Sequence, residues 1–234
     1  MIALLAAAGL AAATPGASPT PVPVLAPEAV VAKYRSALAA LKEPRVFVFE
    51  YSLQQTGTRT LEQVHRVFRS AKDERDETLA VNGNRPSAPV VRIFRNRPYR
   101  YTVAALAPKT ASYDFTFAGL HRDGKHVDYV FSLAPKAPLR GLRFTQVTID
   151  GVTFLPQSVA FASDQHAARG SVSFAKADRY WVVRGASAQA NVPGGVAHER
   201  LAFSAWRFPK ALPRSTFAMP RPLPTLRPTL TSAP

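Results

Sequence analysis

Two histidines and two aspartates within eight residues are the candidates for metal chemistry in this chain. They are His121, Asp123, His126 and Asp128. The Asp-Gly pair at 123–124 predicts a two-residue hairpin, because a type I′ turn needs positive φ at both central residues. Such a turn pairs His121 with His126 at a Cβ separation of about 5 Å, and paired imidazoles bind zinc or copper. Arg122 and Lys125 oppose a cation, so we interpret the segment as an exposed hairpin tip and assign no metal ligand.

The sequence contains no recognised catalytic motif. A nucleophile elbow, a Gly-rich phosphate loop and an HExxH helix are all absent. His65, His166 and His198 are isolated from any nucleophile in the sequence, and the acidic residues cluster mainly at predicted turns and strand ends. We therefore predict neither an enzyme nor a cofactor.

One amphipathic helix is predicted at 27–42, ahead of all the strands. Pro27 suits the first helical position, where its missing N–H costs nothing, and Pro44 ends the helix. Apolar residues recur at helical spacing and form one stripe: Val30, Val31, Tyr34, Leu38 and Leu41. The helix is expected to pack on a sheet, either as a fixed layer or as a lid.

From Arg45 the hydrophobic period changes to that of a strand. Phe47, Phe49 and Tyr51 alternate with residues of the other face, which predicts a half-buried strand with an aromatic inner face. A further strand is predicted at Leu61–Ser70. The charged cluster at 72–77 is interpreted as a solvated strand end or turn.

The rest of the chain predicts a long antiparallel meander. Short β-rich runs, including Tyr99–Val103, are separated by turn pairs such as Asn82-Gly83 and Asp150-Gly151. The segment 121–161 forms four strands in meander order. In all we expect about ten to twelve strands by these signals.

Composition limits the partners of the protein. The chain has 234 residues, which suits one β domain with tails, and 47% of them are hydrophobic, enough for a sizeable core. Its 30 Lys and Arg against 15 Asp and Glu leave a net charge of +15, which favours a lipid surface, nucleic acid or an acidic protein. The absence of cysteine excludes disulfides and thiolate chemistry.

Nucleic acid is the weakest of these partners. The stretch 92–100 interleaves four arginines with two aromatic residues, as a single-strand binding surface would. Its basic and apolar residues fall largely on opposite faces, however, as in an ordinary amphipathic strand. We therefore predict no nucleic-acid partner.

Four segments are predicted along the chain. Residues 1–13 resemble a secretory signal peptide, with small residues at Ala11 and Ala13 but no basic residue ahead of the apolar run. Residues 14–26 form a Pro/Ser/Thr-rich linker, 27–217 the β domain and 218–234 a Pro-rich basic tail without a packed core. An exported, periplasmic location is expected.

The order of these elements and several phrases resemble the LolA/LolB-like superfamily of outer-membrane lipoprotein carriers. The phrases are Tyr129-Val-Phe-Ser-Leu-Ala-Pro135, Phe144-Thr-Gln-Val-Thr-Ile-Asp150 with Leu155-Pro156, and Phe203-Ser-Ala-Trp-Arg-Phe-Pro209. The resemblance implies a strongly curved antiparallel sheet, an incomplete β-barrel, covered by helix. Its concave face would hold a lipid or lipoprotein acyl chain, in a soluble carrier without catalysis.

The ligand-binding residues expected on that face are aromatic or branched. They are Phe47, Phe49, Tyr51, Tyr129, Phe131, Val159, Phe161 and Phe203. The alternative is that these side chains simply fill a core. An anionic membrane surface or an acidic envelope protein are further candidate partners, given the positive charge.

A second resemblance keeps another function open. Residues 47–83 are similar to the N-terminal domain of the RseB/MucB periplasmic sigma-factor regulators, which share the fold and carry a second domain. This resemblance implies an envelope regulatory or sensor module that binds a protein partner. A β-rich enzyme or a basic nucleic-acid binder is the third hypothesis.

Overall fold

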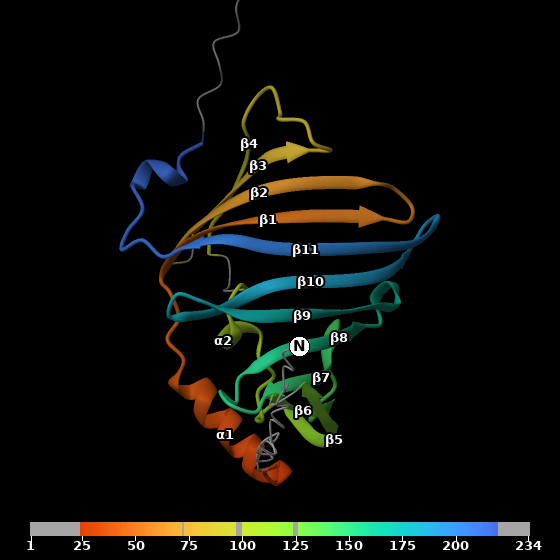
Figure 1. Ribbon diagram of the computed structural model, residues 1–234. Coiled ribbons are helices and arrows are strands. Elements are labelled where there is room, and N and C mark those ends of the chain that lie inside the picture. The colour runs from red at the N-terminus through yellow and green to blue at the C-terminus, as the bar shows by residue number, and fades with distance from the viewer. Residues whose placement is uncertain (1–23, 72, 97–99, 124–125, 220–234) are drawn as a thin grey trace, which may run out of the picture.

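A single antiparallel sheet makes up most of the protein (Figure 1). The computed structural model describes residues 24–71, 73–96, 100–123 and 126–219, so the predicted signal peptide, most of the linker and nearly all of the tail lie outside the described residues. The described strands are β1 (Val46–Thr56), β2 (Leu61–Ser70), β3 (Asp73–Val81), β4 (Val90–Phe94), β5 (Tyr113–Asp123), β6 (His126–Pro135), β7 (Leu142–Asp150), β8 (Pro156–Ser163), β9 (Ala168–Ala177), β10 (Tyr180–Val192) and β11 (Gly195–Arg207).

Strand order follows the predicted meander with one exception. The order is β4-β3-β2-β1-β11-β10-β9-β8-β7-β6-β5, so β1 and β11 are the one neighbouring pair that is not consecutive in the described chain. Strands β4 and β5 are the two edges, and the sheet does not close into a barrel. The expectation of a mainly β protein with one long helix is confirmed.

Helices are few in the described residues. They are α1 (Pro27–Ala40), α2 (Val103–Leu106) and the short 3₁₀ turns η1 (Gln165–Ala167) and η2 (Arg214–Phe217). Helix α1 starts at Pro27, as predicted, and ends at Ala40, a little before the predicted end. No described helix has both the length and the apolar character that crossing a bilayer requires.

The buried stripe of α1 attaches the helix to the sheet. Val30 and Tyr34 are fully buried. The hydroxyl of Tyr34 donates to the carbonyl of Pro108 at 2.7 Å, and the backbone N–H of Leu25 donates to the hydroxyl of Tyr129 at 2.9 Å. Burial raises the pKa of Tyr34, so this phenol is a hydrogen-bond donor at neutral pH.

Two groups of buried side chains form the core. The first apolar cluster consists of Val30, Tyr34, Val103, Ala107, Tyr113, Val127, Tyr129, Phe131, Leu133, Val147, Ile149, Val159, Phe174 and Val183. The second apolar cluster consists of Phe47, Phe49 and Val67, with Tyr51, Tyr101, Phe203, Trp206 and Phe208 packed against it. Phe203 packs against both clusters and so connects them.

Two local predictions are wrong. Residues 73–77 are not a solvated strand end or turn but part of β3, where Glu74 is 1% exposed because it pairs with the buried Arg69. The predicted strand at Tyr99–Val103 is absent from its described part. Thr102 makes only an isolated bridge to Val182, and Val103 begins α2.

The predicted register of the β5–β6 hairpin is also wrong. Asp123 pairs with His126, so His121 lies opposite Asp128 and not opposite His126. The register is two residues away from the prediction, and a two-residue shift keeps each side chain on its expected face. The predicted Asn82-Gly83 turn is confirmed, with positive φ at both residues.

Candidate functional site

The face of the sheet that packs against α1 is the candidate binding surface, and we call it the inner face. One row of paired residues crosses it from β1 to β5. The row is Leu53, Leu201, Ala186, Val172, Val159, Val147, Phe131 and Phe117. Because successive side chains alternate between faces, Tyr51 and Tyr129 share the inner face with this row.

The structure divides the predicted ligand residues between the two apolar clusters. Phe47 and Phe49 belong to the second cluster, and Tyr51 packs against it. Tyr129, Phe131 and Val159 belong to the first cluster.

The remaining two predicted residues lie between these groups. Phe203 pairs with Tyr51 and packs against both clusters. Phe161 pairs with Gly170 across β8 and β9. A Cβ at position 170 would lie 2.6 Å from the ring of Phe161, so only glycine admits this ring.

The second cluster is a stack of aromatic rings. The ring centres of Phe49 and Trp206 are 4.4 Å apart, and those of Phe49 and Tyr101 are 4.7 Å apart. Phe203 and Phe49 are 5.7 Å apart. Such offset arrangements add about 0.5–1.5 kcal/mol a pair beyond the area that they bury. The sequence motif for the last strand included Trp206, but its role in this stack was not predicted.

Most of the predicted ligand residues are closely packed. Phe47 and Phe49 are 0% exposed, and Tyr129, Phe131 and Val159 are at most 2% exposed. In this conformation these side chains therefore fill a core, as the alternative interpretation of the sequence expected. An apolar ligand reaches them only through an adjoining groove or by displacement of the elements that cover them.

One apolar groove does reach this face, between α1 and the edge strand β5. Its volume is about 540 Å³, and its lining includes Val31 from α1, Tyr113, Phe115 and Phe117 from β5, and Phe131 from β6. Phe117 is 41% exposed. We call it the α1–β5 groove. Its size lies in the range of 300–1,000 Å³ that is typical of ligand pockets.

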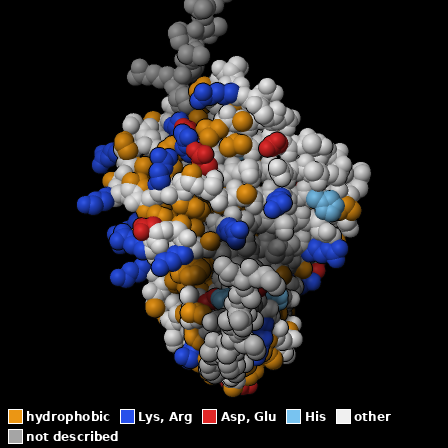
Figure 2. All heavy atoms as spheres, viewed as in Figure 1, with side chains coloured by type: hydrophobic (Ala, Val, Ile, Leu, Met, Phe, Trp, Pro, Cys, Tyr) orange, Lys and Arg blue, Asp and Glu red, His pale blue; other side chains and the backbone are white. Residues whose placement is uncertain are grey.

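A basic pocket of about 800 Å³ lies beside the other end of α1. Its charged lining residues are Lys42, Glu43, Arg45, Lys176, Arg179 and Lys210, and its aromatic ones are Tyr180, Trp181 and Phe208. Figure 2 shows Lys and Arg side chains along the left side of the molecule, interleaved with hydrophobic ones, where Figure 1 places the β9–β10 turn and the end of β11. Five cations against one carboxylate favour anionic groups at this pocket.

Buried charged groups follow the second cluster along β2 and β3. Arg69 and Glu74 form an ion pair of 2.9 Å, with both side chains at most 1% exposed. His65 Nδ1 lies 2.8 Å from Asp76 Oδ1, and the ring of His65 stacks on that of Tyr51 at 4.6 Å. His65 is therefore not isolated. The sequence analysis missed these pairs because the cross-strand register that creates them has no local signal.

These charged groups do not form a reactive centre. The hydroxyl of Tyr51 donates to Asp76 at 3.2 Å, and burial, together with the charge of Asp76, raises the pKa of this phenol. A raised pKa keeps the phenol protonated at neutral pH and makes it a poor nucleophile. The groups join β1, β2 and β3.

Another groove lies on the opposite face. It has a volume of about 820 Å³ and crosses β1, β11, β10, β9 and β8. Its side chains are small or polar, such as Ala160, Ser171 and Ser187, with Arg169 and Arg200. Phe161, one of the predicted ligand residues, also lines this groove.

Comparison with known proteins gives similarity only at the level of structure. No family model matches the chain, and no curated protein matches it. Among solved structures, it is similar to a LolA superfamily protein from Nitrosomonas europaea, with 10% identity and a TM-score of 0.44 over 84% of this chain and 99% of that one. An outer membrane lipoprotein-sorting protein domain from Vibrio parahaemolyticus gives 15% identity and a TM-score of 0.46, over 81% and 96%.

MucB is a third similar structure. It has 16% identity and a TM-score of 0.34, and the match covers 82% of this chain and 63% of MucB. MucB has also been solved in complex with MucA. These are the two groups that the sequence motifs resemble. Similarity at this level assigns no ligand and no partner to this chain.

Proposed function

We propose that this protein is an exported, non-catalytic binding protein that holds the acyl chain of a lipid or of an acylated protein on its inner face. The observation that carries the proposal is the α1–β5 groove. It presents aromatic side chains beside the charged Glu28, Asp114 and Lys136, and it contacts Phe131, which belongs to the first apolar cluster and lies in the row that crosses the sheet. A chain entering there meets apolar side chains from the surface to the core.

Energetics favour a carrier of this kind without any chemistry. Removing one CH₂ group from water contributes about 0.8 kcal/mol, so a long acyl chain gains on the order of 10 kcal/mol. A membrane offers nearly the same gain. A carrier therefore needs only an apolar surface of similar extent, which the inner face supplies once it is accessible.

We further propose that α1 acts as the movable cover of the inner face, and that the curved, open sheet functions as an incomplete barrel. Among the described helical residues of α1, only Val30 and Tyr34 are buried. The helix touches the first apolar cluster, whereas the described residues of the second cluster come from β1, β2, β11 and the segments around Tyr101 and Phe208. Moving one short helix would expose apolar surface without breaking the strand pairing.

A charge placed in the groove tests this proposal. Phe117→Asp puts a carboxylate at a residue that is 41% exposed and belongs to neither apolar cluster. Contact with one aromatic ring contributes about 1.5–3 kcal/mol, so we expect the affinity for a fluorescent fatty acid to fall at least about tenfold. The affinity is measured by fluorescence titration of the full chain.

Leu120→Asp is the matched control. Leu120 lies on the same strand, is 37% exposed and does not line the groove. Its variant should bind the fatty acid as the unmodified protein does. If both variants bind equally well, or if the unmodified protein takes up no fatty acid, the acyl-chain proposal is wrong.

A regulatory module that binds a protein partner is the second candidate function. It is favoured by the close packing of Phe47, Phe49 and Phe131, which leaves a filled core and not an open cavity. Strand β5 also has an unpaired edge, to which a partner strand could add. Native mass spectrometry of the chain purified from a bacterial periplasm separates the two, since a co-purifying lipid supports the carrier and a co-purifying peptide supports the module.

A further inference from the structure

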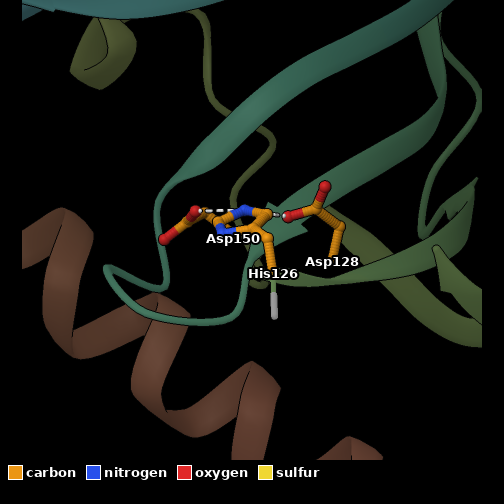
Figure 3. A group of neighbouring side chains, drawn as sticks. All are labelled: His126, Asp128 and Asp150. Atoms are coloured by element: carbon orange, nitrogen blue, oxygen red, sulfur yellow. Dashed lines mark ion pairs between the residues drawn. The ribbon is translucent and has the colours of Figure 1, made fainter. Parts of the chain in front are cut away.

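A histidine and two aspartates converge at one end of the sheet, on the face opposite α1. His126 begins β6, Asp128 follows on the same face of that strand, and Asp150 ends β7 directly opposite Asp128. The aspartates are 5% and 8% exposed. Figure 3 shows the imidazole of His126 between the two carboxylates. The second Asp-Gly pair of the sequence, predicted only as a turn, thus supplies the third member of this group.

The three side chains have the spacing of metal ligands. His126 Nε2 lies 2.9 Å from Asp128 Oδ1 and 2.9 Å from Asp150 Oδ2, and one ligand atom from each residue lies within 4.8 Å of the other two. Zinc binds imidazole nitrogen and carboxylate oxygen at about 2.0–2.2 Å, which places neighbouring ligand atoms of a tetrahedral site about 3.4 Å apart. A small outward shift of the side chains would admit an ion at the centre.

Hydrogen bonding alone does not account for the contacts of His126. Its Nε2 atom lies 2.9 Å from the amide nitrogen of Gln157 as well as from both carboxylates. One ring nitrogen either donates one hydrogen or accepts one. It can therefore satisfy only one of these three neighbours well, whereas a cation would satisfy the ring nitrogen and both carboxylates at once.

The carboxylates are held in place by residues around them. Asp150 Oδ1 accepts hydrogen bonds from the N–H groups of Val152 and Thr153 and from the hydroxyl of Thr153, so Oδ2 faces His126. The amide of Gln157 donates to Asp128 Oδ1 at 2.7 Å. Such partners orient the ligands of metal sites and raise their affinity.

The local charge also suits a cation, in a protein of net charge +15. By register, His121 lies beside Asp128 and Asp123 beside His126, on the same face as the cluster, while Arg122 lies on the other face. The objection that Arg122 repels a cation here therefore does not hold, and Lys125, the other residue of that objection, lies outside the described residues.

We propose that His126, Asp128 and Asp150 bind a divalent transition-metal ion of the zinc type. One imidazole and two carboxylates are ligands that zinc accepts, and His121 is the neighbour best placed to complete the set. The ion would join β6 to β7 beside the turn that leads into β8. Its role would be structural, independent of any ligand on the inner face.

Calorimetric titration of the tag-free full chain with zinc chloride tests this site. We expect one ion per chain, and binding at least about tenfold weaker in His126→Ala and in Asp128→Asn, because even the loss of an outer partner weakens metal sites 10–100-fold. His198→Ala removes an exposed histidine from another part of the sheet and should bind zinc normally.

Cobalt provides a second readout that does not depend on stability. Cobalt bound by His126 should give visible absorption bands that His126→Ala abolishes. If the unmodified protein binds neither ion, or if His126→Ala binds as well as His198→Ala, the proposal is wrong and the cluster is an internal ion pair. Asp128→Asn, which keeps the shape of the side chain, decides the matter if His126→Ala does not fold.

Discussion

At the scale of single residues, the buried ion pair of Arg69 and Glu74 is the least expected feature of this protein. A charge cluster normally indicates solvent exposure, yet Glu74 faces Arg69 across β2 and β3 with almost no exposure. Tyr101 also donates to Glu74 at 3.2 Å. The pair lies next to the aromatic second cluster, where each charge offsets the other in a region with little solvent.

Glu74→Ala should therefore destabilise the protein strongly. The substitution leaves the guanidinium of Arg69 buried without its carboxylate, which costs about 3–5 kcal/mol in the free energy of unfolding. Urea denaturation followed by circular dichroism measures the change.

The surface pair of Arg95 and Asp73 is the matched control for that measurement. Its side chains are 55% and 41% exposed. Asp73→Ala should cost no more than about 1 kcal/mol, because water and salt screen exposed pairs. Equal losses in the two variants would contradict the burial argument.

At the scale of elements, α1 is held by few specific contacts. Its apolar stripe packs against the first cluster, and one buried hydrogen bond joins Tyr34 to the carbonyl of Pro108. This bond connects the helix to the segment after α2, which lies far from it in sequence. The proposed movement of α1 as a cover requires this bond to break.

Tyr34→Phe removes the bond while keeping the aromatic ring. It should lower the free energy of unfolding by about 1–3 kcal/mol, since the buried carbonyl of Pro108 loses its donor. If α1 is a cover, the same variant should take up fatty acid faster in stopped-flow fluorescence.

Ser36→Ala provides the comparison, because Ser36 lies on the exposed side of α1 and bonds only within the helix. Ser36→Ala should change the free energy of unfolding by no more than about 0.5 kcal/mol, and it should leave the rate of fatty-acid uptake nearly unchanged. Unchanged uptake in Tyr34→Phe, despite lower stability, would mean that α1 is a fixed layer of the core.

At the scale of the whole molecule, the net charge of +15 is unevenly distributed. The basic pocket gathers five cations around aromatic side chains at one end of α1. Arg179 lies 5.1 Å from the ring of Tyr180, which in turn packs against Phe208. Aromatic and cationic side chains together suit the boundary between lipid headgroups and acyl chains.

Binding to anionic vesicles should therefore depend on this pocket and on salt. Each Lys or Arg near an anionic surface contributes about 1 kcal/mol. The double substitution Lys176→Glu with Arg179→Glu should weaken binding to phosphatidylglycerol vesicles at least about tenfold. Raising the salt concentration should also weaken the binding of the unmodified protein to these vesicles. Vesicle co-sedimentation measures both effects.

The control is a second double substitution, Arg122→Glu with Arg140→Glu. It makes the same change of net charge at residues that do not line the basic pocket. If this control weakens binding as much as the pocket variant does, net charge alone governs attraction to the membrane. If neither variant nor salt has any effect, an anionic membrane surface is not a partner.

The sequence by itself determined most of the elements and their faces. Periods of 3.6 and 2 residues follow from local backbone geometry, so the α1 stripe and the inner-face position of Phe49 or Phe131 could be read without a fold. The same holds for Pro27 at the start of α1 and for the Asn82-Gly83 turn, since local φ preferences decide both. The location of the predicted binding face thus followed from the chain alone.

Only the tertiary structure decided which residues meet across strands. The pairing of β1 with β11, the burial of Glu74 on Arg69 and the meeting of Asp150 with His126 all depend on register between segments that have no local signal for one another. Register is set by the summed packing of whole strands. The register of β5 on β6 places His121 opposite Asp128 instead of His126, and the register of β6 on β7 brings Asp150 to His126 and Asp128.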